Sequence, residues 1–263
     1  MTPERLLIVS LSNGQAASVA LRLRGRGRGG TVSSELVDTT EMYLRTFYEL
    51  LEEGVELRRA RIVERLHQSG PTVSQTVARM ARDGLVVVES DRSISLTQEG
   101  HDVAQTVMRK HRLAECLLTQ VIGLRPDLVH DEACRWEHVI SGEVEKRLTG
   151  LLDNPDVSPY GCPLPPEQTG CCPDGSVRFR DDSMPLDEVI AEVGCPVSVT
   201  ATRLSEFFQA TEGNLADVYA AGLLPGKSIE VDDDADGIRL TGSEGSVVVD
   251  PGILSGLFVA QNS

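Results

Sequence analysis

The chain has 263 residues, 40% of them hydrophobic, a formal net charge of −15 and a pI near 4.8. This hydrophobic content excludes wholesale disorder, and the length allows two or three small domains. The acidic balance argues against contact with DNA phosphates unless the positive charge is concentrated locally. No apolar run approaches the roughly 18 residues of a membrane-spanning helix.

The compartment follows from the N-terminus and the cysteines. The best N-terminal apolar run is Leu6–Val9, and arginines follow it rather than precede it, so the sequence does not resemble a secretory signal. We therefore expect a cytoplasmic protein that does not enter the membrane. Its six cysteines are then expected to be reduced, and some of them are available to bind metal.

Residues 1–34 have the composition of a tail. Arginine alternates with glycine between Leu21 and Gly30, and such a segment cannot bury one face. Five arginines against Glu4 give it a charge of +4. We predict a disordered or non-native N-terminal extension, and a basic arm on nucleic acid is the alternative.

Residues 35–97 predict a winged helix-turn-helix domain. Asp38 is placed to cap a helix whose apolar positions run from Met42 to Leu51. Further along, helical spacing, a Gly-Pro turn and two short β-rich runs complete the pattern. The predicted elements are helices at Arg59–His67 and Pro71–Asp83 and strands at Leu85–Val88 and Ser93–Leu96.

The charge of this domain favours DNA binding. Between Leu57 and Arg82 there are six arginines and one acid, Glu64, a local charge of +5. A solvated helix face would normally mix both signs. The third helix also begins with small polar residues and Gln75, which suit phosphates and base edges in a major groove.

Residues 98–153 predict further helices that carry metal donors. His111 and Glu115 are spaced i, i+4, so they share one helical face. A later helix carries thiolate, carboxylate and imidazole groups along one side, all donors for a transition metal. The alternative is a charged helix surface with a hydrogen-bonded histidine and a core cysteine. The donors of that later helix are His130, Cys134, Glu137 and His138.

The remainder is less helical. Residues 154–185 contain the proline-rich run Ser158–Pro166, which predicts an extended polyproline II linker. Residues 186–263 predict a small β-barrel that could dock the linker. Its strand-like runs are Val197–Thr202, Ile229–Val231, Ile238–Thr241 and Val247–Val249.

Five motifs together resemble the iron-dependent repressors of the diphtheria-toxin repressor family. They are Leu36–Arg45, Gln68–Arg79, Met108–Glu115, Val129–His138 and Ser158–Pro165. The resemblance is close from about residue 36 to 165 and loose beyond. It implies a mainly α chain with a winged-helix domain (35–97), a helical metal-binding and dimerisation domain (98–153) and a C-terminal SH3-like domain (186–263).

The resemblance also implies site residues. A regulatory metal site would use Met42, Cys134, Glu137 and His138, and an ancillary site would use His111, Glu115, His130, Glu206 and Gln209. Base contacts would come from Ser69, Pro71 and Gln75, and phosphate contacts from Arg59, Thr72, Ser74 and Arg82.

The implied function is a homodimeric, metal-dependent repressor of iron homeostasis genes that binds palindromic operator DNA, with one or two dimers per operator. Thioether and thiolate donors favour Fe(II) over Mn(II), with two ions per subunit. Co(II), Ni(II), Mn(II) and Zn(II) are possible substitutes. Metal that links Met42 to the dimerisation helices would orient the DNA-binding domains.

Two alternatives remain open. One is a manganese-responsive repressor of the same superfamily, and the other is a non-haem iron enzyme or metal-handling protein. Against an enzyme, the sequence offers neither a separate acid/base pair nor a glycine-rich phosphate loop. Cys162, Cys171, Cys172 and Cys195 have no part in this scheme, and either exposed linker thiols or a redox or zinc element would account for them.

Overall fold

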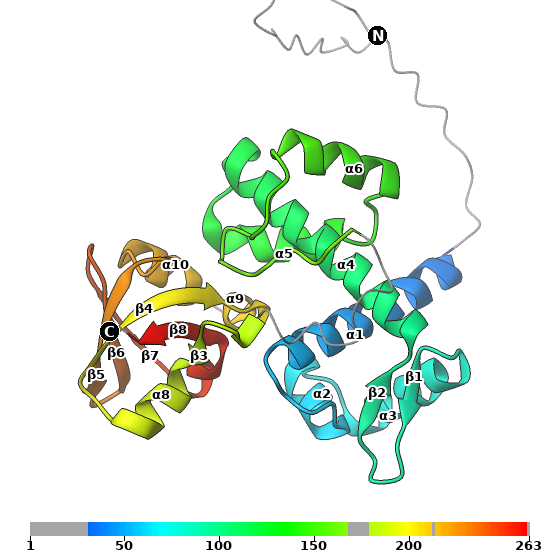
Figure 1. The fold of residues 1–263 in the computed structure, drawn as a ribbon. Helices are drawn as coiled ribbons and strands as arrows, with labels where there is room; N and C mark the ends of the chain where they lie inside the picture. Colours follow the sequence, from blue (N-terminus) through cyan, green and yellow to red (C-terminus); the bar gives the residue numbers. More distant parts are fainter. Residues whose placement is uncertain (1–30, 168–178, 212–213, 262–263) are drawn as a thin grey trace, which may run out of the picture.

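The computed structural model describes residues 31–167, 179–211 and 214–261, which form three parts in chain order (Figure 1). A helical unit with a two-stranded ribbon comes first, a second helical unit follows, and a β-sheet with short helices comes last. Within these residues, no helix combines the length and the apolar character that crossing a membrane requires.

The first helix, α1 (Thr31–Glu52), begins seven residues before the predicted cap at Asp38. The prediction of a helix start there is therefore wrong, and α1 crosses the expected boundary at residue 34. No glycine or proline stands between Thr31 and Glu52, so nothing in the sequence stops the helix from extending back towards Gly30. The rest of the predicted N-terminal extension, residues 1–30, lies outside the described residues.

The winged helix-turn-helix is confirmed. It consists of α2 (Arg59–Leu66), α3 (Gly70–Arg82) and the antiparallel strands β1 (Val86–Val88) and β2 (Ile94–Leu96). The turn forms because His67 adopts a left-handed conformation with φ of 50°, and the Ser69 side chain caps α3 by accepting from the Thr72 amide. Buried Val73, Val77 and Met80 fix α3 against the core.

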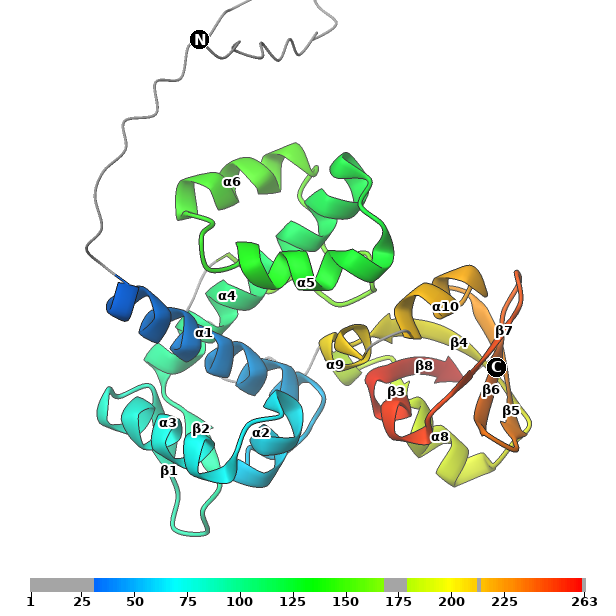
Figure 2. The same cartoon turned by 180° about the vertical axis from the view of Figure 1, so that it is seen from behind.

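The predicted helical region follows as α4 (Gln98–Leu117), the π-helical turn η1 (Leu118–Ile122), α5 (Pro126–Trp136) and α6 (Gly142–Leu151). Helix α4 begins against the wing, where a Cβ on Gly100 would lie 1.9 Å from the Leu85 carbonyl oxygen. In Figures 1 and 2, α4 runs from the ribbon past α1 to α5 and α6. It therefore belongs to both helical units.

The proline-rich segment is not the extended linker that its composition predicts. Residues 156–164 turn back on themselves, because the Ser158 amide donates to the Cys162 carbonyl and the Leu164 amide to the Asp156 carbonyl, both at 2.8 Å. Tyr160 and Cys162 are completely buried. Burial of these two side chains therefore outweighs the polyproline II preference of the flanking prolines.

The C-terminal part is built on one antiparallel sheet with strand order β3-β8-β4-β5-β6-β7. All four predicted strands are present, whereas the short edge strand β3, the last strand β8 and the helices were not predicted. The strands are β3 (Met184–Pro185), β4 (Val197–Leu204), β5 (Ser228–Asp234), β6 (Gly237–Thr241), β7 (Ser246–Val249) and β8 (Leu257–Gln261). The helices are α8 (Leu186–Val193), α9 (Glu206–Ala210), α10 (Asn214–Ala220) and η2 (Pro251–Gly256).

Two hydrophobic cores hold these parts together. One joins α1, α2, α3 and the ribbon to the first half of α4. The other is continuous from the second half of α4 through α5 and α6 to the C-terminal sheet, with Tyr160 and Cys162 between them. Helix α9 lies at the edge of the sheet, facing the C-terminal end of α1 (Figure 2).

Candidate metal centre

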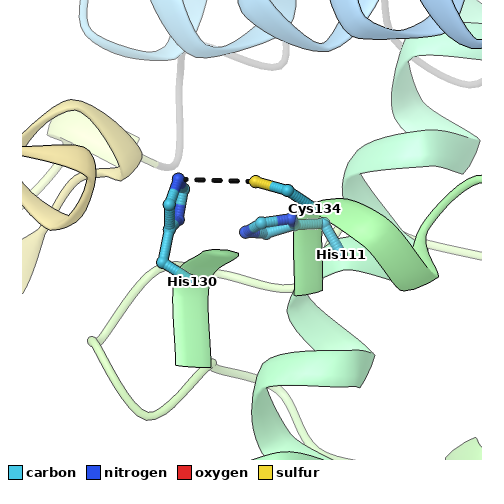
Figure 3. Close-up of side chains that lie close together, drawn as sticks. All are labelled: His111, His130 and Cys134. Atoms are coloured by element: carbon cyan, nitrogen blue, oxygen red, sulfur yellow. Dashed lines mark hydrogen bonds between the residues drawn. The ribbon is translucent and has the colours of Figure 1, made fainter. Parts of the chain in front are cut away.

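Three donor side chains from α4 and α5 converge between the helical units (Figure 3). One ligand atom from each of His111, His130 and Cys134 lies within 4.8 Å of the other two. The i, i+4 spacing of His130 and Cys134 places both on one face of α5, with the His130 Nε2 atom 3.5 Å from the Cys134 Sγ atom. The structure thus brings together residues from both predicted sites.

Two glutamates extend this cluster. The His111 ring lies between them, with Nε2 at 3.0 Å from a Glu115 oxygen and Nδ1 at 2.6 Å from a Glu137 oxygen. His111 and Glu115 are fully buried, and the second Glu115 oxygen has no hydrogen-bond partner among the described residues. A buried carboxylate oxygen of this kind is a natural ligand for a cation, so the donor set fits a divalent metal.

Neighbouring positive charges keep two of these donors, Cys134 and Glu137, deprotonated. Burial by itself raises the pKa of the Cys134 thiol, but the charges of Arg45 and His130 outweigh it and hold that pKa well below its ordinary value. The pKa of Glu137 is likewise lowered by Arg45 and His111 against the effect of burial. Cys134 and Glu137 are therefore thiolate and carboxylate, which are the forms that bind metal.

His111 holds a proton in this arrangement. Burial lowers the pKa of its imidazole, but Glu115, Cys134 and Glu137 more than reverse that effect and raise it well above the ordinary value. Both ring nitrogens then donate to carboxylates. A metal ion bound at this ring would have to displace one of those protons.

The remaining regulatory residues lie at the junction with α1. His138 Nδ1 is 2.7 Å from a Glu41 oxygen of α1, and His138 Nε2 is 3.3 Å from a Glu137 oxygen. Met42 follows Glu41, and its half-buried side chain packs against the core of the DNA-binding domain. The residues predicted for the regulatory site thus come from both helical units, and their joint binding of one metal ion stays a prediction.

Sequence reasoning missed Arg45. Its guanidinium Nη1 lies 3.2 Å from His111 Nδ1, 3.3 Å from Cys134 Sγ and 3.5 Å from a Glu137 oxygen. The available signal was the i, i+4 series Glu41, Arg45, Glu49, which resembles an ordinary solvated helix face.

The C-terminal part reaches the cluster through α9. Gln209 Oε1 is 3.3 Å from His130 Nδ1. Glu206 instead accepts from the Arg112 guanidinium at 2.8 Å, and that guanidinium also donates to Glu52 of α1. Of the two predicted ancillary ligands from this part, Gln209 contacts the donor cluster and Glu206 pairs with an arginine.

Most of the predicted DNA-contact residues lie at the N-terminal end of α3, whereas Arg59 begins α2 and Arg82 ends α3. Gln75 is exposed on the helix and Arg59 is half-buried at the start of α2. The Ser69 and Thr72 hydroxyls are hydrogen-bonded at 2.8 Å, so Ser69 shapes the helix N-terminus in addition to facing outward. The other predicted contacts are also exposed, namely Pro71, Ser74 and Arg82.

The local charge of +5 overstates the positive charge on this surface. Arg61 pairs with Glu64 inside the counted window, but four other partners come from outside it, among them Glu49 of α1, which lies 3.6 Å from Arg65. Arg58 pairs with Glu56 and Asp91, and the side chain of Arg65 pairs with Glu53 at 2.5 Å. The count from Leu57 to Arg82 leaves out Glu53 and Glu56 just before it and the acids that folding brings to it, Glu49 of α1 and Asp91 of the wing.

Of the remaining cysteines, those that the structure describes do not join the cluster. Cys162 is buried and its thiol donates to the Leu204 carbonyl oxygen at 3.3 Å, so it is not an exposed linker thiol. Cys195 is half-buried, and Cys171 and Cys172 lie outside the described residues.

Two family models match the chain. The N-terminal DNA binding domain of iron dependent repressors matches residues 35–94, and their metal binding and dimerisation domain matches residues 97–166. The diphtheria toxin repressor of Corynebacterium diphtheriae is 53% identical over 201 residues, which cover 76% of this chain and 86% of that protein. The iron-dependent repressor IdeR of Mycobacterium tuberculosis is 50% identical over 200 residues, with the same coverage of 76% and 86%.

Solved structures share the fold. The crystal structure of IdeR from T. acidophilum aligns with a TM-score of 0.63 at 22% identity and covers 89% of this chain and 100% of its own. The manganese regulator SloR aligns with a TM-score of 0.64 at 24% identity and covers 85% and 98%.

Proposed function

The chain belongs to the iron-dependent repressor family, and we propose that its response to iron runs through the contacts between α1 and the donor cluster of α4 and α5. It is a metal-dependent transcriptional repressor that binds DNA. The observation that carries the proposal is that α1, which packs in the DNA-binding core, also contacts Cys134, Glu137 and His138 directly. A change in the positions or charges of these donors therefore alters contacts of α1, the helix that packs in the same core as α3.

Two metal sites per subunit account for the donors. The regulatory site comprises Met42, Cys134, Glu137 and His138, and the ancillary site comprises His111, Glu115, His130, Glu206 and Gln209. When bound, the metal ion would supply a divalent positive charge coordinated by side chains from separate elements. The convergence of His111, His130 and Cys134, which come from both sites, supports metal binding in this region, and the contact of Gln209 with His130 supports the ancillary set.

Fe(II) is the proposed physiological metal. The regulatory donors include the Cys134 thiolate and the Met42 thioether, which are soft ligands and disfavour Mn(II) relative to Fe(II). Co(II), Ni(II), Mn(II) or Zn(II) can occupy such sites in vitro, since affinity alone selects weakly among divalent ions.

The repressor acts as a homodimer through the outer face of η1 and α5. Val121, Ile122 and Leu128 are 58%, 53% and 42% exposed there, beside a groove of about 430 Å³ whose lining includes Trp136. Exposed apolar patches of this kind mark association sites. A two-fold dimer places two α3 helices on a palindromic operator, with one or two dimers per operator.

An anaerobic gel shift tests this function. The DNA is a palindromic operator recovered from a random pool by selection with Fe(II). We expect a shift with Fe(II), a shift with Mn(II) only at much higher concentration, and none with chelator. A preference for Mn(II) would identify a manganese-responsive repressor, and binding that ignores metal would contradict the proposal.

A Glu137→Gln variant provides the matched test of the regulatory site. Glutamine keeps the shape of the side chain but removes the charge that ligates metal. Fe(II)-dependent DNA binding should weaken by about 100-fold, because a metal ligand is lost. Glu143→Gln, on the exposed face of α6, is the control and should leave binding unchanged.

A further inference from the structure

Arg45 contacts three members of the donor cluster. Its guanidinium lies 3.2–3.5 Å from donor atoms of His111, Cys134 and Glu137, on both α4 and α5. Its side chain is 11% exposed. The arginine comes from α1, in the DNA-binding domain, whereas every donor that it contacts here comes from the metal-binding domain.

The charge of Arg45 explains how this cluster stays folded. The Cys134 thiolate and the Glu137 carboxylate lie close together beside the fully buried Glu115, and neighbouring like charges away from water are costly. The protonated His111 offsets part of this negative charge, and Arg45 adds a second positive charge from α1. Arginine is always protonated and its planar fork can serve several acceptors at once. Arg45 therefore does electrostatically what a bound metal would also do.

A guanidinium and a divalent ion cannot share these donors. Two cations within about 4 Å of each other repel strongly in a partly buried site, so a divalent ion on Cys134 and Glu137 disfavours the guanidinium at its present distance of 3.3 and 3.5 Å from them. Glu49, one turn further along α1, offers the displaced guanidinium another partner, because it lies 3.3 Å from the Arg45 Nε atom.

We infer that Arg45 is a built-in competitor of the metal, whose guanidinium must leave Cys134 and Glu137 before a divalent ion can bind them. This rests on the proposed function, since it assigns these donors to metal. The competition also explains how metal binding would be coupled to the position of α1. The group that the metal displaces is anchored on α1, so metal binding breaks contacts that hold α1 to α5. The competition lowers metal affinity and sets the concentration at which the repressor responds.

Titration of the full-length protein with Co(II) under anaerobic conditions tests the inference. The readout is the thiolate-to-cobalt absorption band, which reports metal at Cys134 independently of DNA. Arg45→Met and Arg45→Gln remove the competing charge and should lower the Kd for Co(II) roughly tenfold. Arg45→Lys keeps the charge and should stay within about threefold of the unmodified protein.

The matched control is Arg203→Met. Arg203 is also a buried arginine paired with a carboxylate, at 2.7 Å from Asp182, but it belongs to the C-terminal sheet. It should leave the Kd for Co(II) unchanged. Circular dichroism establishes that each variant is folded, and Arg45→Gln, which can still hydrogen-bond to the cluster, decides the matter if Arg45→Met unfolds.

An unchanged or higher Kd in both neutral variants would overturn the inference, because Arg45 would then organise the donors rather than compete for them. Failure of the proposed function is a separate result. In that case the unmodified protein itself would show no thiolate-to-cobalt band, whatever residue stands at position 45.

Discussion

At the scale of single residues, burial without a partner sets the charge of His101. This histidine of α4 is 5% exposed and packs against the Tyr48 ring at a centroid distance of 5.8 Å. Neither ring nitrogen has a hydrogen-bond partner among the described residues. Burial lowers the pKa of the imidazole, and nearby Asp102 only partly offsets this.

The stability of the fold should therefore fall in mild acid. Unfolded histidine titrates at about pH 6.5, so below that pH the unfolded chain binds a proton that folded His101 resists. Stability from this group is complete above pH 6.5 and is lost as the pH falls towards the lower pKa of the folded state. Urea unfolding at pH 7.5 and 5.5 should show a smaller loss for His101→Phe, and equal losses would contradict the assignment.

The Cys134 thiolate should decide which metal binds. Cys134→Ser replaces a soft donor with a weak hydroxyl, and Co(II) affinity should fall by about 100-fold while Mn(II) affinity changes much less. Metal titrations followed by absorption and by electron paramagnetic resonance measure the two affinities. Cys116→Ser is the control, because the buried Cys116 thiol donates to the Val157 carbonyl instead of joining the cluster. Parallel losses for both metals would show that the thiolate does not select.

Helical spacing indicated His111, Glu115 and the group from His130 to His138 as candidate donors, and the resemblance to the repressor family divided them into two sites and added Met42, Glu206 and Gln209. The side chains that surround the donors could not be predicted from the sequence. Arg45 and Glu41 lie in a helix whose charged positions are compatible with full solvation, and only the crossing of α1 with α5 brings them to Cys134 and His138. Contacts of that kind depend on tertiary packing, which no local pattern records.

At the scale of elements, α4 explains why the proline-rich segment does not behave as a free linker. Proline lacks an amide donor, but its carbonyl oxygens remain strong acceptors. Gln105, Arg109 and Arg112, on successive turns of α4, donate to the carbonyls of Pro166, Pro165 and Pro163 at 2.7, 2.7 and 2.6 Å. The segment is thus bound along α4, and composition alone could not indicate these partners.

Removing one of these three donors, Arg109, should lower the stability of the fold. Arg109 also pairs with Glu145 of α6 at 3.0 Å, and both side chains are about nine-tenths buried. Arg109→Met leaves that carboxylate buried without its partner and should lower the free energy of unfolding by about 3 kcal/mol. Urea denaturation measures the loss.

Arg147→Met is the matched control, because Arg147 and its partner Glu143 are 83% and 74% exposed. Exposed pairs contribute little, so the change should stay within about 0.5 kcal/mol. A similar loss in both variants would show that burial of the Arg109 pair is not the cause.

At the scale of the whole molecule, the order and class of the three parts follow from the sequence, whereas their joining does not. Hydrophobic periodicity is a local property, so it indicates helices and strands but not which of them share a core. The core that runs from α4 into the C-terminal sheet includes Tyr160 and Cys162, which are completely buried in it. Their neighbours Pro159, Pro163 and Pro165 concealed this in the sequence.

The contacts between the C-terminal part and the DNA-binding domain are mostly electrostatic. Arg65 of α2 stacks on the Phe207 ring of α9 at 4.6 Å from its centroid, and Arg180 donates to the Glu53 carbonyl at 3.3 Å. Arg112 joins Glu52 to Glu206 from a fully buried position. The part that carries Gln209 therefore also holds the helix that precedes α3.

This arrangement predicts that α9 protects α2 from local opening. Phe207→Ala removes the ring under Arg65, and a cation–π contact of this kind contributes roughly 1 kcal/mol. Amide hydrogen exchange in Arg59–Leu66 should then become about fivefold faster, since protection falls with the free energy of opening. Phe207→Leu keeps apolar area without the aromatic face and should give a smaller increase. Unchanged exchange in α2 for Phe207→Ala would mean that the two domains open independently. The contact of α9 with α2 would then contribute nothing to the stability of the DNA-binding domain.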